Sequence, residues 1–443
     1  MTSSHPATPD SPAPVSAGER IDAIDTLRGV AVLGILVMNI YAFAMPFAAY
    51  TNPFVMGGQE WYNLGTWFLT HILFDQKFMS LFSMLFGGGL VLMWERSEAR
   101  GTPLAGVYYR RMFWLLVIGA LHAYFIWFGD ILFSYAALGM LIYPLRKRSP
   151  RALIIIACLL LPVALLINHG AYYYMSDLKE RSQEIAELRD AGETLSSEQQ
   201  DTLDEWQEIA LFLVPTEASI RDDVEAHRGS YADIFEHRVP LVAMMQTQGL
   251  FAFMLWRVGG LMLLGMALMK LGILSGKRSP AFYRGLMTAG YGLGLPIMLY
   301  SCVDLYAHGF DSLYTMKQGG VANYIGSVLV AFGHLALVMR IVQSGALSRL
   351  MRRFAAVGRM AFTHYLLHSL ILTSVFYGYG LGLYGDVPRL AQMLFVIAVI
   401  ALQLYVSPLW LERFRFGPAE WLWRSLTYWR RQPMRHANNN SFA

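Results

Sequence analysis

Long runs of apolar residues alternate with short polar stretches along almost the whole chain. A helix of about 20 apolar residues can cross a bilayer, because in hydrocarbon every backbone amide must be hydrogen-bonded within its own segment. The pattern therefore predicts an all-α fold, a polytopic transmembrane helical bundle of about ten spans. The predicted spans lie at 29–46, 63–94, 111–128, 130–145, 151–168, 248–270, 283–306, 321–340, 356–378 and 390–411.

The second of these runs differs from the others in length and in charge. It covers 32 residues and carries Asp75 and Lys77 near its middle. A single span needs only about 20 residues. Three structures are open here: a long tilted helix, a broken helix, or an interfacial piece followed by a span.

Lysine and arginine residues gather in every second loop. The basic loops lie at 96–111, 146–151, 270–284, 340–359 and 413–435. The short loops between them contain only Lys317 and Arg389. Because short cytoplasmic loops collect positive charge, both termini are expected in the cytoplasm.

One long segment, 169–247, has the opposite charge. It holds 17 of the 31 acidic residues against six basic ones, so it carries −11 while the rest of the chain carries +15. Its stretches 178–190 and 197–213 look helical, and Ser196 with Gln199 forms a predicted capping box. We expect an external acidic helical loop, which is either a solvated cover of the outer face or a binding lid.

These features divide the chain into five parts. They are a disordered cytoplasmic tail at 1–19, an N-terminal five-helix half at 20–168, the external loop at 169–247, a C-terminal five-helix half at 248–429 and a cytoplasmic tail at 430–443.

The composition argues against several classes of function. Only 15% of the residues are charged, whereas soluble domains carry about 25%. The basic residues mark membrane orientation and do not form a surface with exposed aromatics, so no nucleic-acid partner is expected. Cys158 and Cys302 lie in apolar runs without a CxxC pattern, which argues against a disulfide framework or a zinc site. His364 and His368 are four residues apart without a third ligand, so hydrogen bonding is favoured over a metal site.

Charged and polar groups within the spans are the candidate functional residues, since a charge at the bilayer centre costs about 2.5–3.5 kcal/mol. Asp25 and Arg28 lie at the inner mouth of the first span. They form either an interfacial salt bridge or a cytoplasmic binding site for an anionic donor. Asn39, near the outer end of the same span, either bonds a neighbouring helix or fixes a substrate carbonyl or hydroxyl.

A histidine and an aspartate in the second span are a candidate acid–base pair. His71 and Asp75 are four residues apart, so they share a helical face. A carboxylate beside an imidazole raises its basicity and orients it, as a general base requires. Alternatively, Lys77 neutralises Asp75.

Three further residues within or beside the spans are candidates for substrate binding. His122 and Asp130 are eight residues apart, which places them on similar faces about two helical turns from each other. Asp130 is also a candidate N-cap of the fourth span. Arg257, in the sixth span, faces either an anionic ligand or an acidic partner such as Asp304.

The sequence resembles the YeiB family of bacterial inner-membrane proteins, whose C-terminal half carries the domain of unknown function 418. The resemblance covers nearly the whole chain after residue 20. It rests on RIDAIDTLRGVAVLGILVMNI (20–40), KFMSLFSMLFGGG (77–89), GDILFSYAALGMLIYPLR (129–146), VGRMAFTHYLLHSL (357–370) and RFGPAEWLWRSLTYW (415–429). The chain departs from the family pattern at His364 and His368, where Asn and Gln are expected. The family implies a multipass protein of the bacterial inner (plasma) membrane.

A more distant resemblance links the first span to the transmembrane acetyltransferases that acetylate heparan glucosamine. Asp25, Arg28 and Gly29 match their Asp-x-x-Arg-Gly pattern, and Asn39 matches their Asn near the outer end. Those enzymes take acetyl-CoA on one side of the membrane and acylate a sugar on the other, using an Asn and a His. In this chain the histidine position falls at Tyr50 and Thr51.

The leading hypothesis is therefore a transmembrane acyltransferase. It would move an acyl group from a cytoplasmic acyl-CoA co-substrate to a hydroxyl or amine of an envelope glycan or lipid, without a permanently bound cofactor. His71 would be the general base, Asp75 its orienting partner and Asn39 the stabiliser of the oxyanion. The predicted substrate-binding residues are Asp25, Arg28, Lys77, His122, Asp130 and Arg257.

Two alternatives use the same residues without acyl transfer. A transporter or permeation pathway for a small polar or anionic solute would line its cavity with Arg257, Asp304 and the intramembrane histidines. A membrane scaffold would use the polar residues only to tie helices together. The lipid bilayer is the expected partner in every case, and a homodimer is open.

Overall fold

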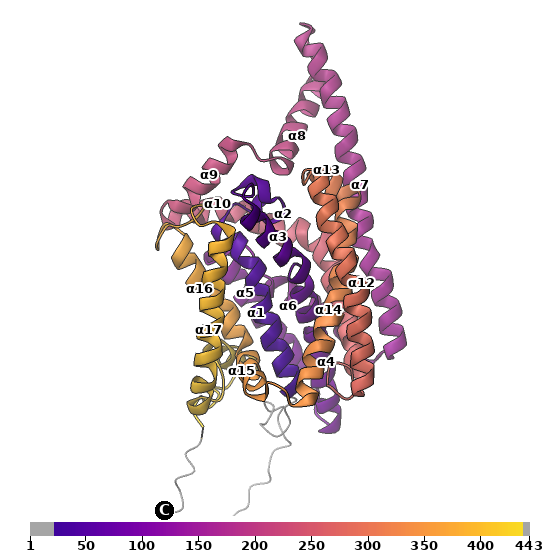
Figure 1. The fold of residues 1–443 in the computed structure, drawn as a ribbon, viewed down its shortest axis with the longest axis vertical. Helices are drawn as coiled ribbons and strands as arrows, with labels where there is room; N and C mark the ends of the chain where they lie inside the picture. The colour runs from indigo at the N-terminus through magenta and orange to yellow at the C-terminus, as the bar shows by residue number, and fades with distance from the viewer. Residues whose placement is uncertain (1–21, 437–443) are drawn as a thin grey trace, which may run out of the picture.

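The computed structural model describes residues 22–436, and this part of the chain folds into helices without a strand (Figure 1). The predicted all-α fold is confirmed. The predicted tail at 1–19 lies outside the described residues, as does 437–443 at the end of the other tail.

The helices follow one another with mostly short connections. In chain order they are α1 (Asp22–Ala44), α2 (Ala48–Thr51), η2 (Pro53–Val55), α3 (Trp61–Leu73), α4 (Lys77–Ala99), α5 (Ala105–Phe125), α6 (Leu132–Ile142), η3 (Tyr143–Lys147), α7 (Pro150–Asp190), α8 (Ser197–Leu213), α9 (Glu217–Arg228), α10 (Tyr231–Met244), η4 (Met245–Met254), α11 (Leu255–Lys270), α12 (Pro280–Ala307), α13 (Ser312–Tyr314), η5 (Thr315–Gly319), α14 (Gly320–Ser344), α15 (Ser348–Arg359), α16 (Ala361–Phe376), α17 (Arg389–Arg413) and α18 (Pro418–Tyr428). The segments η2 and η3 are 3-10 helices, and η4 and η5 are π-helical.

Seven helical stretches of the described chain are long and apolar enough to cross a membrane. They are Asp22–Ala44, Trp61–Ala99, Pro150–Asp190, Tyr231–Lys270, Pro280–Ala307, Ser312–Ser344 and Arg389–Arg413. The other three predicted spans correspond to α5, to the 11-residue α6 and to the 16-residue α16. The predicted span at 356–378 began too early, because the chain turns at Met360 and residues 348–359 form the separate helix α15.

The long second run is a broken helix, one of the three structures that its sequence allowed. α3 ends at Leu73 and α4 begins at Lys77. Gln76, between them, has a left-handed backbone with φ of 58°. The break places Asp75 and Lys77 at the junction of two helices, in the interior of the bundle.

α1 is the central helix of the bundle, and 18 of its 23 residues are buried. A helix that is apolar on all sides can be surrounded by protein, and α15, α16, α4 and α17 all pack against α1. α1 and α15 approach most closely where two glycines meet. A Cβ added at Gly29 would lie 2.0 Å from the Phe354 carbonyl oxygen, and one at Gly358 would lie 1.8 Å from the Asp25 carbonyl oxygen.

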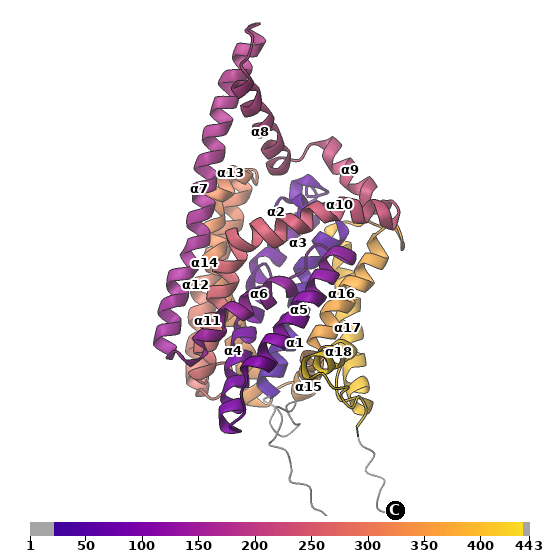
Figure 2. The ribbon, with the colours of Figure 1, turned by 180° about the vertical axis from the view of Figure 1, so that it is seen from behind.

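The acidic segment projects from one end of the bundle, as Figure 2 shows. α7 is a continuous helix of 41 residues, about 60 Å long, so the predicted helix at 178–190 is its last part. The chain returns through α8, α9 and α10, and the predicted capping box of Ser196 and Gln199 at the start of α8 is confirmed. We call this end of the bundle the loop end. The opposite end, which holds the start of α1 and the end of α4, is called the arginine-rich end (Figure 1).

α4 and α11 are also held together by close glycine contacts. A Cβ at Gly265 of α11 would lie 1.9 Å from the Met84 carbonyl oxygen, and one at Gly87 of α4 would lie 1.9 Å from the Met262 carbonyl oxygen. Small residues let membrane helices approach backbone to backbone. By contrast, a Cβ at Gly259, also in α11, would meet nothing within 4 Å.

The Gly265→Ala substitution is therefore expected to force α4 and α11 apart and to lower the free energy of unfolding by about 1–3 kcal/mol. Gly259→Ala is the matched control and should be neutral or slightly stabilising, because alanine favours the helix. Thermal unfolding of the purified protein in detergent measures both. Equal melting temperatures for the two variants would contradict this packing.

Candidate functional site

A cavity of about 330 Å³ lies in the arginine-rich half of the bundle, between α1, α4, α5, α6, α15, α16 and α18. Six arginines line it: Arg28, Arg96, Arg100, Arg111, Arg359 and Arg424. Only two acidic residues, Asp25 and Glu420, lie among the lining residues, so the wall carries an excess of positive charge. The predicted binding residues Asp25 and Arg28 thus belong to this cavity.

Both acidic residues of the cavity wall are already engaged. Asp25 pairs with Arg28 at 2.8 Å, which is the salt bridge that the sequence predicted. Glu420 accepts hydrogen bonds from the backbone amides of Phe362 and Thr363, at 2.7 and 3.1 Å, and from the Thr363 hydroxyl. Burial raises the pKa of Glu420, and these hydrogen bonds partly oppose the rise. The carboxyl thereby anchors α18 to the start of α16 and closes one side of the cavity.

Arg111 connects the charged wall to the aromatic residues of α18. Its guanidinium lies 3.7 Å from the centre of the Trp423 ring, and the Trp423 indole donates to the Arg111 carbonyl at 2.8 Å. The charges of Arg424 and Arg28 also act on Arg111. Several like charges held this close favour the binding of an anion between them.

The rest of the cavity wall is largely apolar. It includes Phe82, Leu85, Phe86, Leu115, Leu132 and Phe362, and the Phe362 ring packs against Trp423, on which Arg111 stacks. Tyr135 and Tyr365 also belong to the wall, and the Tyr135 hydroxyl is 2.7 Å from the Ser83 hydroxyl. The cavity wall therefore combines arginines with apolar and aromatic side chains.

A chain of three buried polar groups lies directly behind Tyr365. His122 Nδ1 is 2.7 Å from Asp130 Oδ2, and His122 Nε2 is 2.9 Å from the Ser369 hydroxyl oxygen. Because the carboxylate accepts the Nδ1 proton, Nε2 accepts from the hydroxyl of Ser369. The Tyr365 hydroxyl accepts from the amide of Ile131 at 3.0 Å and lies 3.5 Å from Asp130 Oδ2. This carboxylate–imidazole–hydroxyl order is the arrangement that activates a hydroxyl in general-base catalysis.

The sequence foresaw part of this group. The predicted placement of His122 and Asp130 two helical turns apart on similar faces is wrong, because α5 ends at Phe125 and the turn that follows brings Asp130 into direct contact with His122. Asp130 also caps the start of α6 by accepting from the Phe133 amide at 2.9 Å, as the sequence suggested. Ser369 and Tyr365 were missed. Their spacing of four residues on α16 was the available signal, but His364 and His368 were the only polar residues of this segment that the sequence analysis considered.

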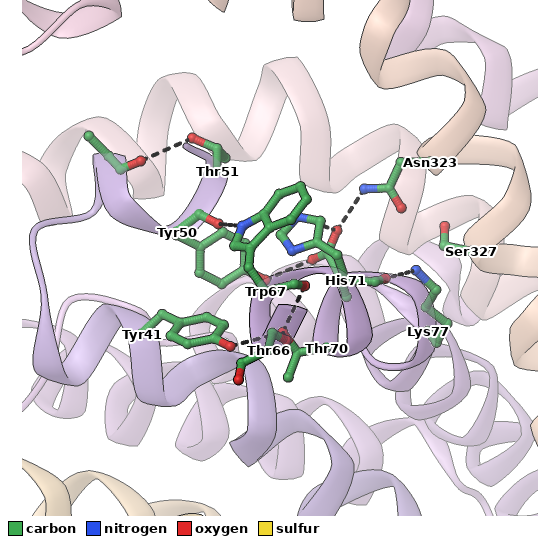
Figure 3. A network of polar contacts seen from close by, with 12 residues as sticks. Tyr41, Tyr50, Thr51, Thr66, Trp67, Thr70, His71, Lys77, Asn323 and Ser327 are labelled. Carbon is green, nitrogen blue, oxygen red and sulfur yellow. Dashed lines mark hydrogen bonds and ion pairs between the residues drawn. The ribbon is translucent and has the colours of Figure 1, made fainter. Parts of the chain in front are cut away.

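The predicted pair of His71 and Asp75 belongs to a second polar network, toward the other end of α1 (Figure 3). His71 Nε2 lies 3.7 Å from Asp75 Oδ2, which is beyond a hydrogen bond. Asp75 instead accepts from the Tyr50 hydroxyl at 2.8 Å and from the Asn323 amide at 2.6 Å. Lys77 donates to the His71 carbonyl at 2.6 Å. Tyr50 therefore shares this carboxylate with Asn323.

The remaining predicted residues lie outside the cavity wall. Arg257 donates to the Tyr324 carbonyl and to the Ser327 hydroxyl, each at 2.6 Å. The acidic residue whose charge acts on Arg257 is Asp75, whereas Asp304 accepts from the Tyr314 hydroxyl at 2.9 Å. Asn39, on α1, is half-buried and does not line the cavity.

The two histidines of α16 form separate hydrogen bonds to α17, as the sequence favoured. His364 Nε2 is 2.7 Å from the Ser407 hydroxyl, and His368 Nε2 is 2.9 Å from the Gln403 side-chain oxygen. The catalytic roles of Asn39, His71 and Asp75 stay predictions.

Known proteins resemble the chain over almost its full length. It is 32% identical to the uncharacterized protein YxaH of Bacillus subtilis (strain 168), over 95% of this chain and 97% of that protein. It is 30% identical to the uncharacterized protein YeiB of Escherichia coli (strain K12), over 92% of this chain and 96% of that protein. Residues 268–430 match the family model "Protein of unknown function (DUF418)". The chain belongs to the YeiB/DUF418 family.

Membership in the YeiB/DUF418 family confirms the predicted resemblance, and together with the long apolar helices it fits a multipass membrane protein. An uncharacterized 39.9 kDa protein in the amylase 3' region of Bacillus acidopullulyticus is also similar, at 25% identity over 95% of this chain and 97% of that protein. No solved structure matches the chain.

In this DUF418 protein, Asp75→Asn is expected to be strongly destabilising. Asp75 and Lys77 are both almost fully buried, and their charges act on each other. Removing the carboxylate leaves a buried ammonium without its counter-charge, which typically costs about 3–5 kcal/mol. The control is Asp177→Asn, because the Asp177–Arg181 pair is exposed on α7. Thermal unfolding compares the variants, and a wild-type melting temperature for Asp75→Asn would show that the Lys77 charge is balanced elsewhere.

Proposed function

We propose that the chain is a transmembrane acyltransferase that uses a cytoplasmic acyl-CoA and acylates a hydroxyl or amine on the opposite side of a bacterial plasma membrane. The observation that carries this proposal is one cavity whose wall holds six arginines and also Tyr365, behind which lies the buried Asp130–His122–Ser369 chain. The positive loops at the arginine-rich end support its assignment to the cytoplasm.

The composition of the cavity suits the parts of an acyl-CoA. Arginine binds phosphate oxygens through several parallel hydrogen bonds, so the arginine cluster would hold the phosphates of the nucleotide. Trp423, stacked on Arg111, offers an aromatic face near these charges. The apolar wall from Phe86 to Phe362 would hold the thioester arm and the acyl chain.

The position of His122 along α5 supports transfer across the membrane. Arg111 and His122 are both on α5 and are 11 residues apart, which corresponds to about 16 Å along the helix axis. His122 lies in the last turn of α5, near the loop end, where the Phe125 carbonyl accepts from Tyr231 of α10. A donor held at Arg111 would thus extend its thioester toward an acceptor that arrives from the loop end.

In this mechanism His122 is the general base and Asp130 orients it. The imidazole Nε2 would exchange its hydrogen bond from Ser369 for one from the acceptor, and it would remove the proton of the acceptor hydroxyl or amine as the acceptor attacks the thioester carbonyl. The new C–O or C–N bond forms, the C–S bond breaks, and the imidazolium returns the proton to the leaving thiolate. We assign the base to His122 rather than to His71, because the cavity wall reaches Tyr365, which contacts Asp130, and does not include His71 or Asp75.

His122→Gln is expected to slow acyl-CoA turnover by about 100-fold or more while leaving acyl-CoA binding unchanged. His71→Gln is the matched variant and should keep most of the activity. The measurement is release of free CoA thiol by protein in nanodiscs, with acyl-CoAs from acetyl to palmitoyl and with envelope extract as the acceptor source. If His71→Gln abolishes turnover and His122→Gln keeps it, the general base belongs to the Asp75 network and not to the His122 group. Wild-type protein that neither binds nor turns over any acyl-CoA, but takes a solute into liposomes, would identify a transporter instead.

Arg111→Ala should weaken acyl-CoA binding about 10-fold, because it removes a charge-assisted hydrogen bond of roughly 1.5–3 kcal/mol. Arg349→Ala, at the same end but outside the cavity wall, should leave the affinity unchanged. Isothermal titration with CoA at two salt concentrations measures both, and the loss should shrink at high salt. If Arg111→Ala and Arg349→Ala bind CoA with equal affinity, the nucleotide does not bind at Arg111.

A further inference from the structure

A second cluster of ionisable side chains lies at the loop end, far along the chain from the cavity residues. Asp223 and His227 belong to α9, and His237 belongs to α10. One ligand atom from each of the three side chains lies within 4.8 Å of the others. Neither the arginine-lined cavity nor the Asp75 network includes these residues.

The two histidines converge on the same carboxylate oxygen. His237 Nε2 is 2.7 Å from Asp223 Oδ1, and His227 Nδ1 is 3.4 Å from that atom. His227 Nδ1 also donates to the Asp223 backbone carbonyl at 2.8 Å, so binding of an ion there requires loss of this proton and of this hydrogen bond. Two ligands bound to zinc at about 2.0–2.1 Å in tetrahedral positions are roughly 3.3 Å apart. The two separations from Asp223 Oδ1 lie on either side of this value, and all three ligand atoms lie within 4.8 Å of one another, so side-chain movements of about an ångström would bring them around one ion.

The other atoms of the cluster are held by neighbours, as is typical for metal ligands. The Tyr384 hydroxyl donates to Asp223 Oδ2 at 3.0 Å and thereby turns Oδ1 toward the histidines. The His227 ring stacks on the Tyr384 ring at 4.1 Å, with 7° between their planes. Bonds of this kind, made to the ligands from behind, orient a metal site and raise its affinity.

The exposure and the donor atoms of the cluster also suit a cation. The His237 side chain is 40% exposed, so an ion can enter from solvent. Two imidazoles and one carboxylate form a set of ligands that binds zinc in preference to calcium or magnesium, which prefer oxygen ligands.

We propose that Asp223, His227 and His237 form a zinc-binding site, with water or an external ligand in the fourth position. Spacing of cysteines gave no sign of this site, because its ligands are an Asp and a His four residues apart on one helix and a second His ten residues later.

Zinc at this position would fasten the external helices to the loop that follows α16. Arg228 of α9 already pairs with Asp386 and donates to the Tyr384 carbonyl at 2.7 Å. The neighbouring Gly385 amide donates to the carbonyl of Ala44, the last residue of α1, at 2.8 Å. The ion would therefore stabilise the cover over the loop end of the central helix. This inference does not depend on acyl transfer.

The test uses the full-length protein in nanodiscs after removal of metals with EDTA. Titration with Zn²⁺ by calorimetry should show one tight site per chain, and His237→Ala should weaken it at least 10-fold. The exposure of His237 makes this variant safe for folding. The control is His169→Ala, which removes another exposed histidine of the projecting segment and should leave zinc binding unchanged.

A spectroscopic measurement distinguishes a built site from adventitious surface binding. Co²⁺ in place of Zn²⁺ should give the visible absorption of a four-coordinate ion in wild type and lose it in His237→Ala and Asp223→Asn. Wild-type protein without a tight zinc site would overturn the proposal. The proposal also fails if His237→Ala and His169→Ala bind zinc with equal affinity.

Discussion

A polar group buried inside this bundle must find its partner within the protein, because lipid offers none. In the described structure many buried polar groups meet this constraint through bonds between helices that are distant in sequence, whereas some buried atoms, such as Arg257 Nε and Asn323 Oδ1, have no hydrogen-bond partner. Arg257 of α11 donates to α14, Asn323 of α14 donates to Asp75 beside α4, and His122 of α5 reaches Ser369 of α16. Such bonds specify which helices are neighbours far more narrowly than apolar contacts do. An apolar helix face can pack against lipid as well as against another helix.

The same constraint explains what the sequence could predict. Apolar runs and basic loops located the helices well, because both signals are local in the chain. His122 and Asp130 could be singled out together because only eight residues separate them, but their direct contact depends on the turn after Phe125, which the sequence did not predict. Ser369 lies 247 residues from His122, and no periodicity connects two positions at that distance.

The cavity was beyond prediction for a related reason. Arg111, Arg359 and Arg424 come from three separate helices, and in the sequence each looks like an ordinary loop charge; Arg28, on a fourth helix, was the only arginine of the wall that the sequence singled out. Only the packing of α15 and α18 against α1 and α5 gathers them into one wall. The break at Gln76 was a similar case, because a left-handed residue at a position without glycine is decided by the tertiary fit of α3 and α4.

On the proposed function, the arrangement of charges also explains why two close glycine contacts matter. Gly29 and Gly358 bring α1 within backbone distance of α15, and Asp25 and Arg28 lie in the same turns of α1. A wider separation of these helices would move the arginines of α1 and α15 apart and lower the density of positive charge in the cavity wall. The glycine packing therefore stabilises the bundle and at the same time sets the width of the proposed nucleotide site.

Tyr365 then has a specific place in the energetics of transfer. Its hydroxyl accepts from the Ile131 amide and lies against Asp130, so it closes the cavity off from His122. Moving it aside breaks hydrogen bonds of about 0.5–1.5 kcal/mol each, a cost that the binding of a large donor can readily offset. Without a donor the tyrosine would stay closed, and water from the cytoplasm would be kept from the imidazole. Because the same hydroxyl contacts Asp130, its displacement would also change the carboxylate that orients His122, which couples donor binding to the activation of the base.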